Sequence, residues 1–366
     1  MSGGFEYEES RTSRSQATPL NCTQKGHAAN HLVCHGVVDE KKKMSDDQEP
    51  NDLRDVQPTS FSHVIGQRHV TQALKIAVEA SFQEQKRLDE LLLCGPPGLG
   101  KSALVGVLAK ELAVPFTEVL AQSITNTAEL NTVLLAASHG LLFLDEIHLL
   151  HPVHQHSLLQ VLDKRRIFLS GGKAVQSIPV APFSLVGATT DPDGVIGPLA
   201  DRFRIVLHLD YYEQSELAEI VRQRCRALGW AFEPEILGEI SKRGKGTPRI
   251  ALRLLQSARR VQVAEGGDAL TVANLLRACE VERISDHGLD NIQQKFIHLL
   301  GNGPVRLNVL ASMLGVTTKV LTKTVEPFLL RHGLVVKTDA GLRTLTESGQ
   351  SHLTDLRQVS VQNPSD

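Results

Sequence analysis

Short apolar runs alternate with amphipathic stretches along the middle of the chain. Runs of buried-strand length occur at Leu91–Cys94, Leu141–Leu144 and Phe183–Ala188. Between them, apolar residues recur at helical spacing, as in Ala103–Leu112 and Thr127–Ala137. Because strands that alternate with helices form parallel sheets covered on both faces, this pattern predicts an α/β fold.

The later part of the chain has helical spacing and few strand signals. We expect four successive helices at Ser215–Leu228, Glu233–Arg243, Thr247–Val263 and Thr271–Glu282. Three short helices and two strands then predict a winged helix-turn-helix, at Asn291–Leu300, Leu307–Leu314, Thr317–His332, Leu334–Lys337 and Leu342–Leu345. Polar ends without apolar periodicity predict disordered tails. The expected domains are therefore a tail at 1–58, a P-loop core at 59–210, a helical lid at 211–285, a winged-helix domain at 286–353 and a tail at 354–366.

A glycine-rich loop follows the first buried strand. Residues 95–102 read GPPGLGKS and fit the pattern G-x-x-x-x-G-K-[ST]. The backbone N–H groups of such a loop and the positive end of the next helix bind phosphate. Lys101 adds a point charge, and Ser102 offers a hydroxyl to Mg²⁺. We expect the ATP phosphates to contact the loop and the helix start, at Gly95, Pro96, Pro97, Gly98, Leu99, Gly100, Lys101, Ser102 and Ala103.

Polar residues end two other strands of the same predicted sheet. Asp145 and Glu146 follow Leu141–Leu144, where Asp145 can hold Mg²⁺ and Glu146 can polarise the attacking water as a general base. Thr189 and Thr190 end the Phe183 strand, and either one is placed to hold that water. These positions predict a nucleotide-hydrolysing site at the carboxyl edge of the sheet.

Three further arginines are candidate phosphate contacts. Arg202 and Arg204 lie in a short turn before the strand Ile205–Leu209, where either could make a local salt bridge or reach the γ-phosphate bound by a neighbouring subunit. In the lid, Thr247 and Pro248 are typical N-cap and N1 residues. The following Arg249 therefore has a fixed place at a helix start.

Composition and charge restrict the classes of binding partner and the cellular location that we expect. The chain has 366 residues and a formal net charge of −2, so any nucleic-acid surface must be local. No apolar run is long enough to span a membrane. Five cysteines without CxxC spacing predict free thiols in a reducing cytoplasm. The crowded histidines are expected to be solvated rather than to bind a metal, namely His148, His151, His154 and His156.

With these motifs in place, Phe61 to Leu353 resembles the RuvB family of AAA+ ATPases, the bacterial motors of Holliday-junction branch migration. The matching stretches occur in family order: VIGQ at 64–67, GPPGLGKS at 95–102, LFLDEIH at 142–148, PFSLVGATT at 182–190, PLADRF at 198–203, GTPRIALRLL at 246–255, GPVRLNVLASMLG at 303–315 and VEPFLLRHGLV at 325–335. The resemblance implies a Walker B pair at Asp145 and Glu146, and sensor 1 at Thr189 or Thr190. It further implies a trans-acting arginine finger at Arg202, sensor 2 at Arg249 beside Pro248, and adenine contacts at Val64, Ile65 and Tyr212.

The departures from the family predict a divergent paralogue. The acidic helix after Walker B is replaced by HPVHQHSLLQVLDKRR, and the hairpin that docks the junction-binding protein RuvA in the family here has a Gly171-Gly172 tip within Ile167–Val180. Docking to a RuvA-like partner is therefore an open question. The wing keeps one arginine, Arg343, at a place where the family has Arg-Gly-Arg.

The winged helix carries a modest basic surface. Lys319 and Lys323 are i, i+4 neighbours on its third helix, and Lys337 and Arg343 flank the wing tip. We expect an ATP- and Mg²⁺-dependent ring, a hexamer in the family, that drives branch migration on four-way junction or duplex DNA. The alternative is a regulatory AAA+ ATPase that remodels a protein partner docked through the winged helix.

Overall fold

The computed structural model describes residues 56–170 and 175–362. Nearly all of the tail expected at 1–58 lies outside this range, as do Cys22, Cys34 and the glycine tip of the hairpin. Among the residues described, Cys94, Cys225 and Cys279 are buried, free thiols. None of the described helices is long and apolar enough to cross a bilayer.

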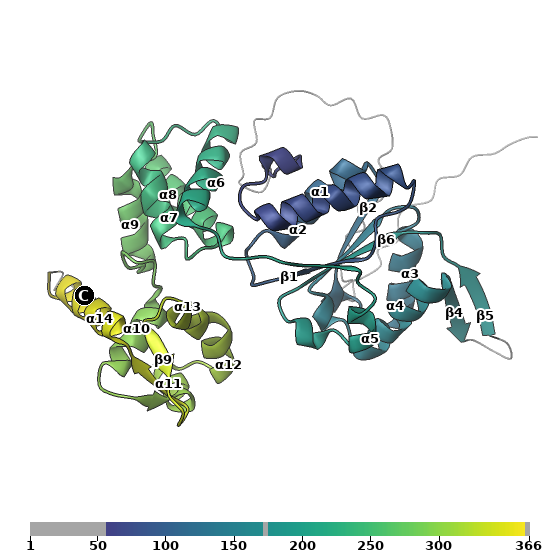
Figure 1. Ribbon diagram of the computed structural model, residues 1–366. Coiled ribbons are helices and arrows are strands. Elements are labelled where there is room, and N and C mark those ends of the chain that lie inside the picture. The colour runs from purple at the N-terminus through teal and green to yellow at the C-terminus, as the bar shows by residue number, and fades with distance from the viewer. Residues whose placement is uncertain (1–55, 171–174, 363–366) are drawn as a thin grey trace, which may run out of the picture. The chain divides into compact units, whose positions relative to one another are not determined.

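A five-stranded parallel sheet forms the first part of the fold (Figure 1). Its strand order is β2-β3-β6-β1-β7. The strands are β1 (Leu91–Cys94), β2 (Phe116–Leu120), β3 (Leu141–Asp145), β6 (Ser184–Thr189) and β7 (Ile205–His208). Every residue of β1 and β6 is buried; β1 is apolar throughout, whereas β6 also buries Ser184 and Thr189 at its two ends.

Helices cover both faces of this sheet, so the expected α/β fold is confirmed. They are α1 (Arg68–Gln83), α2 (Lys101–Leu112), α3 (Thr127–Ala136), α4 (Pro152–Lys164) and α5 (Gly197–Ala200). Successive strand residues point to opposite faces. Leu91 and Leu93 of β1 therefore pack into the core under α1 and α2, whereas Leu92 and Cys94 pack into the core under α3 and α4.

An antiparallel hairpin follows α4. Its strands are β4 (Arg166–Ser170) and β5 (Val175–Pro179), paired in the register Ile167 with Ile178. The hairpin expected from the alternating arms is confirmed, and its exposed apolar side chains include Phe168 and Ile178.

Four helices form the lid, as expected: α6 (Gln214–Ala227), α7 (Pro234–Arg243), α8 (Pro248–Ala264) and α9 (Val272–Glu282). Local capping sets where they begin. Glu213 and Glu216 close a capping box at α6, and Thr271 and Asn274 close one at α9. Pro248 occupies the first turn of α8, where its missing N–H costs nothing.

The C-terminal part is a winged helix with a three-stranded sheet. It contains α10 (Asn291–Leu300), α11 (Leu307–Leu314), α12 (Thr318–Val320), α13 (Glu326–Arg331), β8 (Val305–Arg306), β9 (Val335–Lys337), β10 (Leu342–Leu345) and α14 (Glu347–Gln362), with strand order β8-β10-β9. The sequence did not predict β8, because two residues are too few for an alternating pattern.

The single helix expected at Thr317–His332 is confirmed as one continuous helical run from Thr318 to Arg331, in which a π-helical turn at Leu321–Val325 joins α12 to α13. Pro327 has no N–H and its ring opposes the carbonyl four residues earlier, so the backbone widens before it. The tail expected from residue 354 is instead the end of α14, which His352 and Leu353 anchor because both are buried.

Candidate functional site

Three strand ends meet at the carboxyl edge of the parallel sheet. β1 lies between β6 and β7, and β6 also pairs with β3. The Gly95 N–H donates a 3.1 Å hydrogen bond to the carbonyl of Thr189, which ties the start of the glycine-rich loop to the end of β6. The loop, Asp145 and the two threonines are therefore brought together by sheet topology.

The glycine-rich loop has a backbone that only glycine adopts easily. Gly98 has φ +84°, and a Cβ placed there would lie 2.9 Å from the Cβ of Arg249. Lys101 begins α2 and donates hydrogen bonds of 2.8 and 3.1 Å to the carbonyls of Gly95 and Pro96. The lysine ammonium is thus held across the loop, close to the N–H groups at the start of the helix.

Burial lowers the pKa of Lys101, while the carboxylates of Glu146 and Asp145 oppose this shift. Desolvation disfavours the charged ammonium, so an anion that binds beside it stabilises the charged form of Lys101. A phosphate group is such an anion, and the loop and helix start provide its N–H donors.

Ser102 and Asp145 form a pair of oxygen ligands. The Ser102 Oγ donates a 3.3 Å hydrogen bond to Oδ2 of Asp145, from the first turn of α2 to the end of β3. Hydroxyl and carboxylate oxygens are the ligand types that Mg²⁺ prefers, and it usually takes one or two protein groups together with phosphates. These two residues therefore fit an ion bound together with a nucleotide.

Glu146 is held by three polar groups. Its Oε2 accepts hydrogen bonds of 2.9 and 3.3 Å from the hydroxyl and N–H of Thr190, and lies 3.3 Å from Nδ1 of His148. Its backbone has φ +51°, a conformation that costs energy outside glycine. Thr189 is fully buried, and its hydroxyl contacts His148 at 3.0 Å and accepts from the N–H of Asp191.

The segment before α1 and the start of the lid line the other end of the site. Tyr212 donates a 3.1 Å hydrogen bond to the carbonyl of Leu99, and burial raises its pKa to about 12. The Gln67 side chain donates to the carbonyl of Asp210 at 2.6 Å and accepts from its N–H at 3.2 Å. These bonds join the Val64–Ile65 segment to the chain that enters the lid.

A single cavity of about 320 Å³ connects these groups, a size within the range of small-molecule sites. Many of the expected site residues line it: Val64, Ile65, Pro97, Gly98, Gly100, Lys101, Ser102, Ala103, Asp145, Glu146, Tyr212, Pro248 and Arg249. The expected contacts Gly95, Pro96, Leu99, Thr189 and Thr190 do not line it, and Leu99 and Thr189 are fully buried.

The sequence analysis missed several lining residues. They are Pro58, His63, Leu104, Ile220, Gln223, Arg224 and Leu252. Ile220, Gln223 and Arg224 lie at i, i+3 and i+4 on α6, so they form one face of a helix. That spacing was visible in the sequence, but nothing in it indicated that this face meets the glycine-rich loop.

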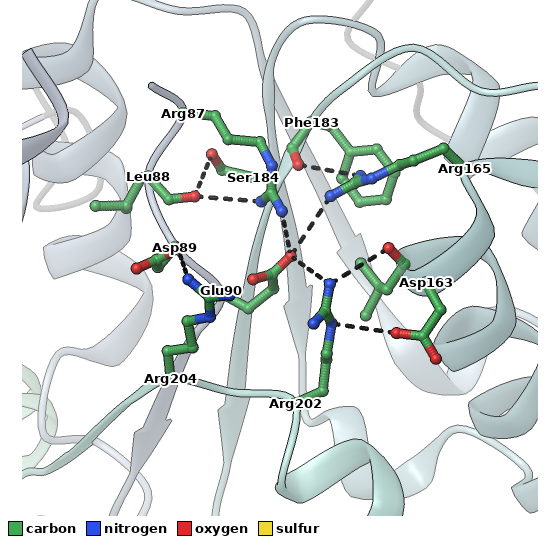
Figure 2. A network of polar contacts seen from close by, with 11 residues as sticks. Arg87, Leu88, Asp89, Glu90, Asp163, Arg165, Phe183, Ser184, Arg202 and Arg204 are labelled. Atoms are coloured by element: carbon green, nitrogen blue, oxygen red, sulfur yellow. Dashed lines mark hydrogen bonds and ion pairs between the residues drawn. The ribbon is translucent and has the colours of Figure 1, made fainter. Parts of the chain in front are cut away.

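Arg202 does not line this cavity. Its guanidinium lies 3.5 Å from Asp163 and 4.0 Å from Glu90, at the amino edge of the sheet (Figure 2). Arg204 pairs with Asp89 at 3.2 Å. Within one subunit, the local salt bridge considered for each arginine is therefore what the structure contains.

The expected DNA residues separate into two groups. Lys319, Lys323 and Lys337 are exposed. Arg343 instead forms an ion pair within the domain. Its Nε and Nη2 donate to the Glu326 carboxylate at 2.5 and 3.2 Å, and only 11% of its side chain is exposed. The assignment of Arg343 to the DNA surface is corrected to a structural ion pair.

The histidine-rich stretch after Glu146 is only partly solvated. His154 is buried, and its Nδ1 has no hydrogen-bond partner among the described residues, which corrects the expectation for that residue. Within residues 56–170 and 175–362, no group of three or more histidine, cysteine, aspartate or glutamate side chains could hold a metal ion.

Three family models match consecutive parts of the chain. They describe the Holliday junction DNA helicase RuvB P-loop domain at residues 56–209, the RuvB AAA lid domain at 212–282 and the RuvB C-terminal winged helix domain at 286–354. The Holliday junction branch migration complex subunit RuvB of Paramagnetospirillum magneticum is 35% identical over 85% of this chain and 92% of its own length.

Solved structures agree with these matches. A mutant of Thermotoga maritima RuvB superposes with a TM-score of 0.73 and 34% identity, covering 82% of this chain and 99% of that structure. The structure described as the Thermotoga maritima RuvB Holliday junction branch migration motor gives a TM-score of 0.70 and 33% identity, with 81% and 98% covered.

Proposed function

Because the chain belongs to the RuvB family, as its motifs predicted, we propose that it is an ATP-driven motor that moves the branch point of Holliday junctions. The family hydrolyses ATP. The observation that carries the proposal is the cavity that joins the glycine-rich loop, the Asp145–Glu146 pair and Arg249 of the lid. A winged helix on the same chain supplies the element that binds DNA.

Within the cavity, Lys101 and the loop N–H groups bind the β- and γ-phosphates. Ser102 and Asp145 would hold Mg²⁺, which neutralises phosphate charge when bound. The adenine lies toward Val64, Ile65 and Tyr212. Arg249, whose N–H donates a 3.3 Å hydrogen bond to the carbonyl of Gly98, brings lid charge to the phosphates.

Glu146 is the general base in this proposal. Its carboxylate faces the cavity, and Thr190 and His148 fix its orientation. A carboxylate held in one place can accept a proton from the attacking water as the water oxygen bonds to the γ-phosphorus and the bond from that phosphorus to the bridging oxygen of ADP breaks. General-base catalysis of this kind is worth about 10²- to 10⁴-fold in rate.

The working unit is a ring in which Arg202 serves the adjacent subunit. Arg202 precedes β7 at the amino edge of the sheet, whereas the cavity of the same chain lies at the carboxyl edge.

Mixing two variants tests this arrangement. Lys101→Ala disables the nucleotide site and keeps Arg202, whereas Arg202→Ala keeps the nucleotide site and lacks the arginine finger. Each variant alone should be inactive, and a mixture should regain ATPase activity. Arg204→Ala is the matched control, because it breaks only an exposed pair with Asp89.

Three exposed lysines of the winged helix contact DNA phosphates, namely Lys319, Lys323 and Lys337.

The hairpin β4–β5 is the surface on which a RuvA-like junction-binding protein docks. It exposes the apolar side chains of Phe168 and Ile178, which favour a protein partner. The free thiols of Cys94, Cys225 and Cys279 fit a cytoplasmic location.

The test of the proposed function is ATPase stimulation by a four-way DNA junction. We expect the junction to raise turnover above the DNA-free rate and above that with single-stranded DNA of equal nucleotide content. Equal rates in all three conditions would overturn the DNA-motor proposal and favour an ATPase that remodels a protein partner.

A further inference from the structure

A buried carboxylate at the amino edge of the sheet attracts three arginines from separate segments of the chain. Glu90 immediately precedes β1, and only 1% of its side chain is exposed. The guanidiniums of Arg87, Arg165 and Arg202 approach it at 2.7, 3.5 and 4.0 Å (Figure 2). Although burial opposes it, the hydrogen bond from Arg87, together with the charges of Arg87 and Arg202, keeps the pKa of Glu90 below its usual value.

The three arginines lie at different distances from the Glu90 carboxylate. Arg87 makes a 2.7 Å hydrogen bond to Glu90, whereas Arg165 and Arg202 lie beyond strong hydrogen-bond distance. The hydrogen bonds that these two make to carbonyls are long, 3.5 Å to Phe183 and 3.4 Å to Leu162. The Nε of Arg202 is buried and lies 3.5 Å from Oδ1 of Asp163, too far for a strong hydrogen bond. Because these contacts are long, the exposed parts of both guanidiniums keep donors for another acceptor.

The cluster also carries more positive than negative charge. Three guanidiniums face two carboxylates, Glu90 and the half-exposed Asp163. Burial and repulsion from Arg87 and Arg202 lower the pKa of Arg165, while Glu90 opposes that shift. About a quarter of each of the Arg165 and Arg202 side chains is exposed, 26% and 28%, so an external anion can reach both.

The anion cannot be the nucleotide of the same subunit. Glu90 precedes β1 and Gly95 follows it, so the cluster and the phosphate loop lie at opposite ends of one strand. Strand residues advance about 3.3 Å each, which places the two ends beyond the reach of a direct ion pair. None of the cluster residues lines the cavity of its own chain.

We propose that Arg165 is a second trans-acting arginine, and that Glu90 is a positioning residue that holds Arg165 and Arg202 together against the terminal phosphate of ATP bound by the adjacent copy. This inference rests on the proposed ring. Two planar guanidiniums side by side offer more donors to three equatorial phosphate oxygens than one does. Arg87 stays on Glu90 and fixes the carboxylate.

The first test is ATPase activity of full-length Arg165→Ala, with Arg166→Ala as the matched control. Arg166 is the next residue and is exposed, and its side chain bonds only to Ser177 among the residues described. We expect Arg165→Ala to lower kcat about 10- to 100-fold with unchanged affinity for a fluorescent ATP analogue. Arg166→Ala should retain wild-type turnover. Equal, small effects of the two changes would overturn the role of Arg165.

Subunit mixing then separates a trans role from a structural one. Arg165→Ala mixed with Lys101→Ala should regain activity, because an intact pocket meets an intact pair of arginines at some interfaces. Arg165→Ala mixed with Arg202→Ala should regain none, because each interface lacks one arginine. If Arg165 instead supported its own pocket, this second mixture would recover, and the inference would fail.

The mixture of Lys101→Ala with Arg202→Ala distinguishes failure of the Arg165 inference from failure of the proposed ring. Recovery there, without the pattern expected for Arg165, overturns only the new inference. No recovery in that mixture would overturn both the proposed ring and this inference.

Glu90→Gln tests whether Glu90 positions the arginines. It should lower kcat with KM unchanged and should fail to complement Arg202→Ala. A rise in KM with kcat intact, or complementation of Arg202→Ala, would show that Glu90 is not a positioning residue for the finger.

Discussion

The hydroxyl of Thr190 donates a 2.9 Å hydrogen bond to Oε2 of Glu146, across the gap between the ends of β6 and β3. The sequence left Thr189 and Thr190 as equal candidates for the residue that senses the γ-phosphate. Their contacts differ, because Thr189 is fully buried and bonds to His148 and Asp191. Thr190 is thus the threonine that orients the proposed base.

Glu146→Gln should bind ATP and hydrolyse it very slowly. Glutamine has nearly the same shape and can keep a hydrogen bond to Thr190, but it accepts no proton from water. We expect kcat to fall by about 10²-fold or more, measured as phosphate release, with ATP affinity near that of the wild type. Turnover near the wild-type rate would show that another group is the base.

Thr190→Val should reduce turnover without weakening ATP binding. The change removes a hydrogen bond to a charged acceptor, an interaction worth about 1.5–3 kcal/mol, so kcat should fall at least about 10-fold. Thr190 does not line the cavity, so KM should change little. Thr189→Val should act differently and lower the melting temperature, because it removes a fully buried hydroxyl that accepts from the N–H of Asp191. A faster Thr190→Val enzyme would mean that the bond restrains Glu146 instead of positioning it.

Sequence patterns were enough to predict most of the fold and the nucleotide-binding motifs. Strand ends in a parallel sheet meet by topology, so Lys101, Asp145 and the threonines could be placed together without coordinates. Contacts between distant segments could not be predicted in this way. Glu90 and its arginines come from separate places in the chain, and the α6 face at Ile220 reaches the cavity only through the packing of the lid.

The wing shows the same limit. Arg343 looked like a DNA contact because a basic residue near a wing tip is typical of one. The carboxylate of Glu326, in α13, accepts from Nε and Nη2 on one edge of this guanidinium, and both side chains are largely buried. The helix expected at Thr317–His332 is present, but the π-helical turn before Pro327 was not predicted, although a proline inside a helix is a local signal of such a distortion.

Charge reversal of the three exposed wing lysines should weaken DNA binding. For Lys319→Glu, Lys323→Glu and Lys337→Glu together, each lost phosphate contact removes about 0.9 from the slope of log K against log salt. A control with equal net charge reverses three exposed lysines elsewhere: Lys75, Lys110 and Lys242. Titrations of labelled duplex at several salt concentrations should show a flatter slope only for the wing variant. The same slope in both variants would place the DNA surface elsewhere.

Arg343→Ala should destabilise the winged helix. It leaves the Glu326 carboxylate buried without its partner, a change that costs about 3–5 kcal/mol for buried pairs. Hydrogen exchange of β10 and α13 should rise strongly. The double variant Glu326→Leu with Arg343→Met should recover protection, because it removes both charges at once. Protection unchanged in Arg343→Ala would mean that the pair contributes little and that the arginine is available to DNA.

The winged helix should also lose stability as pH falls through the histidine range. His352 is buried, its ring lies 4.5 Å from that of His287, and its Nε2 has no hydrogen-bond partner within the part of the chain that the structure describes. Burial, together with the neighbouring His287, lowers the pKa of His352, although Asp355 opposes the shift. The folded state therefore favours the neutral ring.

This stabilisation is complete above the unfolded pKa of about 6.5 and is lost as pH falls through the lowered folded value. His352→Leu removes the proton uptake. The difference in melting temperature between pH 7.5 and pH 5.5 should therefore be smaller in this variant than in the wild type, as measured by calorimetry. His69→Leu, at an exposed histidine of α1, is the control and should keep the wild-type difference. If His352→Leu and His69→Leu keep equal pH dependence, His352 titrates as freely in the folded protein as in the unfolded chain.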